Sequence, residues 1–272
     1  MRITNTIALW ILAIMVLMTV STMQDLYSQI QYREIEVTNG GTITGQVSIK
    51  DDAPQIEMLE VNKDVQHCGS STPSPRLSVG KNNGLKNAVV YLKDVEKGKR
   101  LNRDESVVLD QKDCQFTPHV VLLPFGGKLE IVNSDDILHN VRAYHTKDGR
   151  TIFNIAQPIK GQRTSIRPAA FERPGIYHTV CDAAHPWMSA FIVVKEHPYY
   201  TVTVEDGSFT IENIPPSEYT LKIWHGGVNI DDTVVSSGEV VQYRYEDPYT
   251  FSKEVEVKTE EETSVKVRLA LR

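Results

Sequence analysis

The chain has no surplus of positive charge. Its 272 residues carry 29 Lys and Arg against 35 Asp and Glu, which gives a formal net charge of -6. Because the two signs are interspersed along the sequence, no basic face or Arg-rich stripe is available for a phosphate backbone. The composition therefore argues against nucleic-acid binding.

Catalytic motifs and long helical periods are also missing. We find no HExxH motif, no Ser-His-Asp arrangement and no phosphate-cradling Gly loop. Short runs rich in Val, Ile, Thr and Tyr instead alternate with turn residues, as at residues 41–47, 87–92 and 128–132, a pattern typical of strands. The chain is long enough for two ordinary domains, so we predict an all-β protein built from two β-sandwiches.

An apolar stretch without a charge lies near the N-terminus, at residues 7–20, and is followed by a polar run. A membrane span needs about 20 apolar residues, so this shorter stretch is more typical of an export signal. We expect residues 1–28 to be a signal peptide or an N-terminal anchor, and the protein to be periplasmic or extracellular. Contact with a membrane would come only through an uncleaved anchor, and no Cys lies near enough for a lipoprotein.

Cysteine is scarce, with three residues in the whole chain. Disulfides persist in oxidising compartments, and an odd count leaves one thiol over. Cys181 has His185 and Met188 as close neighbours. We therefore predict a disulfide between Cys68 and Cys114, with Cys181 left free for a metal.

The eight residues from Cys181 to Met188 combine a thiolate, an imidazole and a thioether. A mononuclear blue-copper site takes one Cys and two His with a weak axial Met. The alternative is a buried Cys that behaves as a small apolar residue beside unrelated neighbours. The copper interpretation requires a second His from elsewhere in the chain.

Further motifs upstream supply that His. Residues 116–118 (FTP) and 124–126 (PFG) precede the run NSDDILHNV at residues 133–141, and PGIYHTVC follows at residues 174–181. In this order they resemble the cupredoxins, in particular the plastocyanin and amicyanin branch, over residues 104–196; proteins of this arrangement are often labelled methylamine-utilisation-like. The resemblance implies a Greek-key β-sandwich that binds one copper ion through His139, Cys181, His185 and Met188.

The resemblance also assigns neighbouring roles. Asn140 would tie the His139 loop to the backbone beside Cys181, which would fix the orientation of the ligands; an ordinary turn residue is the alternative. Pro186 and Trp187 would surround an exposed edge of His185 and form a docking patch for a redox partner protein, and a packing role for Trp187 is equally compatible with the sequence.

The other histidines are not expected to bind the metal. Side chains of a strand alternate between its faces, so Cys181 shares a face with Tyr177 and Thr179, while His178 points the other way. The remaining histidines read as surface residues or as residues at strand and loop edges: His67, His119, His145, His197 and His225.

One spacing departs from the family. Three residues separate Cys181 from His185, where plastocyanin-like and amicyanin-like loops have two, so the copper–sulfur geometry is open to change. A binuclear copper site shares this spacing but needs two cysteines in the loop, and this loop has one.

A second motif lies downstream, at residues 203–225. Its pattern DGSFTIENIPPSEYTL resembles the carboxypeptidase regulatory-like, or transthyretin-like, β-sandwich, with Asp206-Gly207 as a hairpin turn. The opening strands of such a module match residues 41–47 and 87–92. We expect residues 40–103 and 197–272 to form this sandwich, with the copper domain inserted between them or packed in series.

These features predict an exported type 1 copper protein that carries single electrons to a redox partner and is not an enzyme. The alternatives are a periplasmic or surface binding module with structural or stored copper, and a copper delivery protein.

Overall fold

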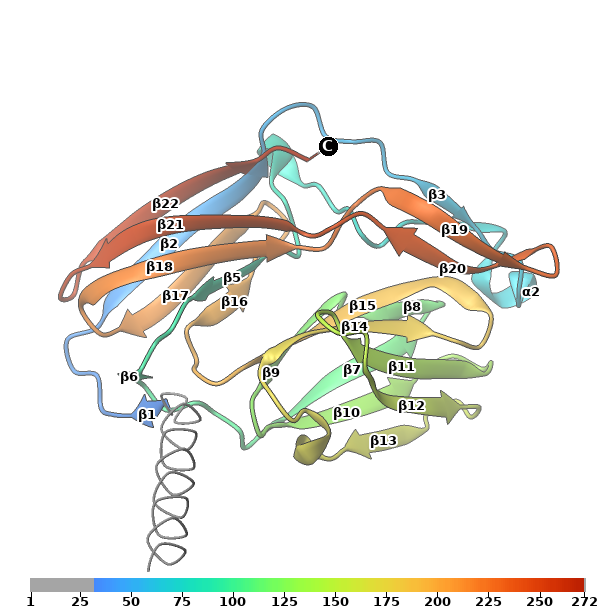
Figure 1. Ribbon diagram of the computed structural model, residues 1–272, viewed down its shortest axis with the longest axis horizontal. Coiled ribbons are helices and arrows are strands. Elements are labelled where there is room, and N and C mark those ends of the chain that lie inside the picture. The colour runs from blue at the N-terminus through green and yellow to red at the C-terminus, as the bar shows by residue number, and fades with distance from the viewer. Residues whose placement is uncertain (1–31, 272) are drawn as a thin grey trace, which may run out of the picture.

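The computed structural model describes residues 32–271, and within that range nearly all regular structure is β (Figure 1). The all-β prediction is therefore confirmed. The predicted signal peptide or anchor at residues 1–28 lies outside the described residues. No helix between residues 32 and 271 has the length and apolar character that a membrane crossing requires.

Residues 106–195 form the first sandwich, which has two sheets. One sheet has the strand order β13-β10-β7-β8, with β7 at Ser106–Lys112, β8 at Gln115–Thr117, β10 at Lys128–Asn133 and β13 at Arg163–Ile166. The other has the order β12-β11-β14-β15-β9, with β9 at Val120–Pro124, β11 at His139–His145, β12 at Thr151–Gln157, β14 at Gly175–Cys181 and β15 at His185–Lys195. The inward-facing apolar residues of both sheets make one core, which includes Leu109, Ile131, Val141, Met188 and Ile192.

Strands from both ends of the chain form the second sandwich. Its four-stranded sheet has the order β16-β5-β18-β21, with β5 at Val89–Leu92, β16 at Tyr200–Val202, β18 at Ser217–His225 and β21 at Tyr249–Val257. Its three-stranded sheet has the order β17-β2-β22, with β2 at Gly41–Ile49, β17 at Ser208–Ile214 and β22 at Glu262–Leu269. The first sandwich is thus inserted between β5 and β16 of the second.

Asp206-Gly207 forms a turn but not the predicted hairpin. The strands on either side of it, β16 and β17, belong to different sheets, so the chain crosses from one sheet to the other. Gly207 has φ +78°, and an added Cβ would lie 2.0 Å from the carbonyl oxygen of Val47. Glycine is needed here for both its backbone conformation and the close approach.

The two sandwiches share an apolar contact. Val89 of β5 and Trp224 of β18 pack against Phe191 and Val193 of β15, together with Val120. Strand β15 is therefore buried on both faces, which explains the unbroken apolar run AFIVV at residues 190–194.

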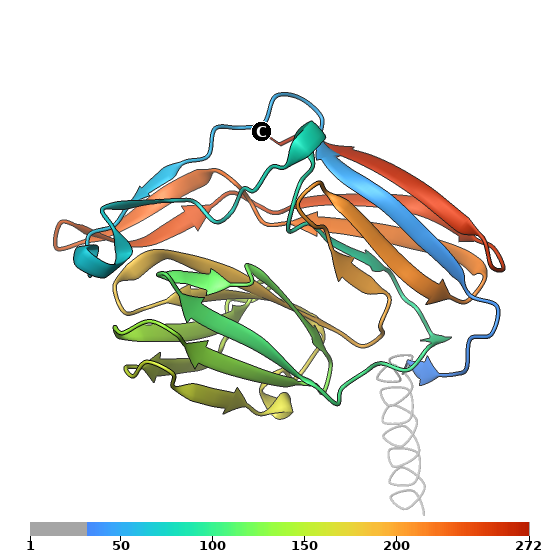
Figure 2. The ribbon, with the colours of Figure 1, turned by 180° about the vertical axis from the view of Figure 1, so that it is seen from behind.

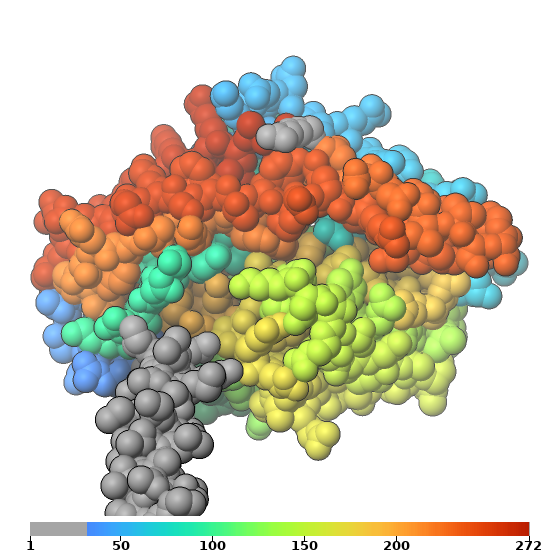
Figure 3. Space-filling model, viewed as in Figure 1, coloured from blue at the N-terminus to red at the C-terminus, as the bar shows by residue number. Residues whose placement is uncertain are grey.

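Two segments leave the second sandwich and lie against the first (Figures 1 and 2). One, which we call the cover, is residues 56–74 and contains β3 (Met58–Glu60), α2 (Val65–Cys68) and β4 (Ser71–Pro73). The other, the arm, is the hairpin of β19 (Ile230–Ser236) and β20 (Glu239–Tyr245). Figure 3 shows the orange arm lying above the yellow-green first sandwich.

The position of both segments differs from the sequence-based prediction, which placed residues 40–103 and 197–272 in the second sandwich. Leu59 and Val61 of the cover are buried in the core of the first sandwich, and Ile230 and Tyr243 of the arm pack against it. Apolar side chains at these positions fit either sandwich, so the sequence did not reveal which one they cover. The remaining short elements are β1 (Arg33–Glu34), β6 (Lys97–Gly98), η1 (Lys81–Asn83) and η2 (Pro168–Ala170).

Candidate metal centre

Three predicted ligands meet at one end of the five-stranded sheet. His139 begins β11, Cys181 ends β14 and His185 begins β15. The Nδ1 atoms of the two histidines are 3.1 Å apart, and Cys181 Sγ lies 3.6 Å from His185 Nδ1. One ligand atom from each of the three residues lies within 4.8 Å of the other two. Both imidazoles are fully buried and Cys181 is 4% exposed, so this is a closed site.

A tight turn brings Cys181 and His185 together despite the extra residue between them. The two residues are paired in the β14–β15 ladder, with a register shift next to Cys181. Ala184, the last residue of the turn, has φ +62°, a left-handed conformation that costs roughly 1–2 kcal/mol for a residue other than glycine. The longer spacing is thus absorbed by the backbone of the turn.

Each imidazole is oriented by a carboxylate. His139 Nε2 lies 2.9 Å from Asp135 Oδ2, and His185 Nε2 lies 2.9 Å from Asp64 Oδ2. A carboxylate accepts hydrogen bonds, so each Nε2 carries the proton and each Nδ1 presents a lone pair. Two lone pairs then face one another across 3.1 Å, an arrangement that repels unless a cation lies between them. Metal-binding histidines are held by carboxylates in this way.

The electrostatics favour neutral imidazoles. Burial lowers the pKa of His139 and of His185, although the neighbouring carboxylates act in the opposite direction. Burial raises the pKa of the Cys181 thiol to about 11, so at neutral pH without a cation the proton stays on sulfur. Metal binding would release that proton, as thiolate ligation requires.

Asp135 is held as a carboxylate by the backbone. Burial acts to raise its pKa, but hydrogen bonds from the Cys114 and Asp113 N–H groups and from His139 outweigh burial, so the pKa of Asp135 is lowered. An ionised Asp135 keeps the Nε2 proton on His139.

Asn140 links the ligand loops as the resemblance implied. Its backbone N–H donates to Cys181 Sγ at 3.3 Å, and its side-chain Oδ1 accepts from the Asp182 N–H at 3.2 Å. Its Nδ2 donates to Asn154 Oδ1 at 2.6 Å. Asn140 therefore fixes the distance between the His139 strand end and the Cys181 turn.

Met188 and Trp187 are both fully buried. Met188, the predicted fourth ligand, belongs to the same apolar cluster as Cys181. The indole N–H of Trp187 donates to the carbonyl oxygen of Cys114 at 3.1 Å. Trp187 is thus a packing residue.

The prediction that Pro186 and Trp187 form a docking patch around an exposed His185 edge is wrong, because neither Trp187 nor His185 is exposed. His185 presents no exposed edge, because Asp64 of the cover binds its Nε2. The sequence prediction assumed an open metal loop, whereas a segment more than a hundred residues upstream closes it. Of the two patch residues, Pro186 alone keeps partial exposure.

The cover is fastened beside the site by the predicted disulfide. Cys68 of α2 and Cys114 are joined, and Cys181 is the free cysteine. His67, next to Cys68, lies 3.4 Å from Asp135 Oδ1. A second cluster of potential ligand atoms, at His67, Cys114 and Asp135, loses its sulfur to this disulfide.

Three residues near the centre were missed from the sequence: Asp64, Asp135 and His67. Asp135 lies four residues before His139, a spacing that could have suggested it. Asp64 and His67 lie near the site because the cover folds over the first sandwich, and no local sequence pattern predicts where the cover lies.

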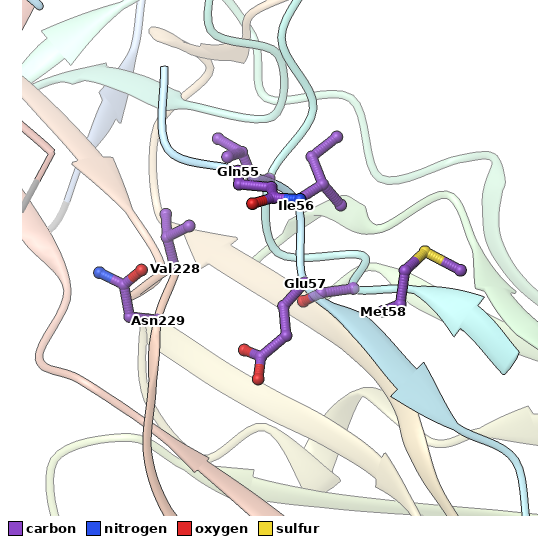
Figure 4. Close-up of a pocket in the computed structure, with 8 residues that line it drawn as sticks. Gln55, Ile56, Glu57, Met58, Val228 and Asn229 are labelled. Carbon is purple, nitrogen blue, oxygen red and sulfur yellow. The ribbon is translucent and has the colours of Figure 1, made fainter. Parts of the chain in front are cut away.

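The remaining histidines lie apart from the centre. His178 faces outward, as strand alternation predicted, and contacts Arg76 and Ser189. His145 is at the other end of β11, beside Arg173 and Asp148. None of the metal-centre residues lines the cavity of about 410 Å³ in Figure 4, which lies between residues 55–58 and Val228-Asn229.

Comparisons with solved structures find copper proteins that are similar to part of this chain. One is a copper-containing nitrite reductase from Thermus scotoductus, with 26% identity and a TM-score of 0.30 over 37% of this chain and 24% of that chain. A second is an amicyanin from Paracoccus versutus, with 22% identity and a TM-score of 0.29 over 34% of this chain and 83% of that chain. A third is a purple cupredoxin from Nitrosopumilus maritimus, with 23% identity and a TM-score of 0.28 over 34% of this chain and 100% of that chain. This chain thus spans about a quarter of the nitrite reductase.

A family model described as polysaccharide lyase family 4, domain II, matches residues 179–243. The match covers less than half of the chain, runs from β14 through the arm, and is not the regulatory-like family that the sequence suggested. That resemblance therefore stays a prediction, and the second sandwich is a β-sandwich without an assigned family. No curated protein matches the sequence.

Replacing Asp135 by Asn should weaken metal binding about 10- to 100-fold, the usual effect of losing a partner that orients a metal ligand. The amide would no longer hold the proton on His139 Nε2 as a carboxylate does. Competition with a chelator of known affinity measures the change. Asp136→Asn, at the exposed neighbouring position, is the matched control, and equal affinities for the two variants would contradict the assigned role.

Proposed function

We propose that the protein is an exported mononuclear type 1 copper protein that carries single electrons. The observation that supports this most strongly is the convergence of the two Nδ1 atoms and the Cys181 sulfur in one buried site. One thiolate and two imidazoles, with a weak thioether from Met188, form the ligand set of blue copper sites.

Copper would supply a one-electron couple, and the chain would keep its ligands in place in both oxidation states. His139, Cys181 and His185 lie on three adjacent strand ends of one sheet. Asn140 links two of these ends, and the two carboxylates hold the imidazoles. Four protein ligands leave no open coordination position for a substrate, so we propose a carrier and not an enzyme.

The N-terminal apolar run supports a periplasmic or extracellular location, where the Cys68–Cys114 disulfide would persist. A redox partner protein would exchange electrons with the centre. Because Asp64 covers His185, the partner would approach over the cover or over the rim near Pro186, not at a bare imidazole edge.

A second candidate is a binding module in which copper is stored or structural. The buried His185 and the disulfide-fastened cover favour it, since both slow exchange of the metal with solvent. Copper delivery would require the cover to open.

Potentiometry of the copper-loaded protein distinguishes these functions. A reversible one-electron couple, with electron exchange that does not release copper, is expected for the carrier. Copper that cannot be reduced and reoxidised reversibly would favour the structural role, and rapid loss of Cu(I) to a chelator would favour delivery.

A further inference from the structure

A buried arginine without a carboxylate partner lies outside the metal centre. Arg76, in the loop after β4, is 5% exposed. Its guanidinium carbon lies 4.6 Å from the ring centroid of Phe191 and 4.1 Å from that of Tyr245. No ion pair reaches Arg76 from any carboxylate between residues 32 and 271. Burial lowers its pKa to about 10, still above neutral pH, so the charge is retained.

An isolated buried charge is costly, and buried charges in proteins are normally paired. Glu246 lies nearby but is engaged elsewhere. Its Oε1 accepts from the N–H groups of Val228 and Asn229 at 3.0 and 3.1 Å, and from the Tyr249 hydroxyl. Arg76 therefore lacks the counter-ion that its burial calls for.

Two hydrogen-bond donors in this region lack an acceptor among residues 32–271, one on Arg76 and one on Tyr144. The buried Nε of Arg76 has no hydrogen-bond partner. Its Nη2 donates to His178 Nε2 at 2.7 Å, and since a guanidinium only donates, that ring nitrogen carries no proton. His178 then donates from Nδ1 to the hydroxyl oxygen of Tyr144, which leaves the Tyr144 proton for another acceptor.

Arg76 and Tyr144 line a cavity of about 370 Å³ between the outer face of the five-stranded sheet and β20. Its walls include the rings of Phe191, Trp224 and Tyr245. Glu246 and Asp247 also line the cavity. Glu246 is held by the Val228 and Asn229 N–H groups, so the cavity offers the Arg76 guanidinium, the Tyr144 hydroxyl and the aromatic rings to an anion with an apolar body.

We propose that this cavity binds a small organic carboxylate, whose oxygens pair with Arg76 and Tyr144 and whose apolar part lies against the aromatic rings. The Arg76 contact would be charge-assisted, which is the stronger kind of hydrogen bond. The site is independent of copper, since none of its donors is a candidate metal ligand.

Isothermal titration of the metal-free full chain with sodium benzoate, at constant ionic strength, tests the proposal. We expect saturable binding, about 10- to 100-fold weaker binding in Arg76→Met and a loss of about 3- to 10-fold in Tyr144→Phe, as the loss of a charged and a neutral hydrogen bond implies. Arg163→Met removes an exposed arginine of β13 and should leave binding unchanged.

Thermal unfolding in the presence of benzoate gives a second readout. The ligand should raise the Tm of the wild type and of Arg163→Met, and raise that of Arg76→Met far less. Three results would each overturn the proposal. The first is that both Arg76→Met and Tyr144→Phe bind benzoate as tightly as the wild type does. The others are that the wild type binds no benzoate, or that it binds sulfate as tightly as benzoate.

Discussion

Replacing Cys181 by Ser should abolish the visible band of the copper-loaded protein and reduce copper affinity by several orders of magnitude. A hydroxyl remains protonated where a thiolate would bind, and soft sulfur is the donor that Cu(I) prefers. The two imidazoles would remain 3.1 Å apart at Nδ1 but would lack the strongest donor. Absorption spectra and chelator competition measure both effects.

The matched control is His178→Gln, three residues earlier on the same strand. His178 faces away from the centre and contacts Arg76, so its replacement should leave the band in place. A band that persists in Cys181→Ser, or disappears in His178→Gln, would contradict the assigned ligand set.

Removing the disulfide with Cys68→Ser and Cys114→Ser should lower the free energy of unfolding by about 2–5 kcal/mol, the usual effect of losing a native disulfide. The same double variant should release copper to a chelator about tenfold faster or more. The disulfide fastens the cover, and the cover carries Asp64, which binds His185. Denaturant unfolding and stopped-flow chelation measure the two effects.

The copper band itself should survive in the double variant, because neither cysteine is a ligand. Asp64→Asn, which keeps the disulfide, separates the two contributions: it should change copper release without the large loss of stability. If both variants release copper to a chelator at the wild-type rate, the cover does not control access to the centre.

Much of the centre could be predicted because most of its proposed ligands lie close together in the sequence. Cys181, His185 and Met188 lie within eight residues, and strand alternation correctly placed His178 on the opposite face. The Cys68–Cys114 pairing followed from the odd cysteine count once Cys181 was assigned to the metal.

The closure of the centre could not be predicted because it depends on tertiary contacts. Asp64 meets His185 across 121 positions of sequence, and no periodicity or motif indicates where the cover lies. The apolar residues in 56–74 and 230–245 indicate that these segments are partly buried, but they do not indicate which of the two sandwiches the segments pack against. The docking patch at Trp187 failed for the same reason.

The central claim is tested most directly by the absorption and EPR spectra of the full chain loaded with Cu(II). Coordination by His139, Cys181 and His185 predicts an intense visible thiolate-to-copper band together with the EPR signal of a single Cu(II) site; the longer Cys181–His185 turn would show in the position and shape of that band. A colourless Cu(II) complex, or a protein that takes up no copper, would contradict the account.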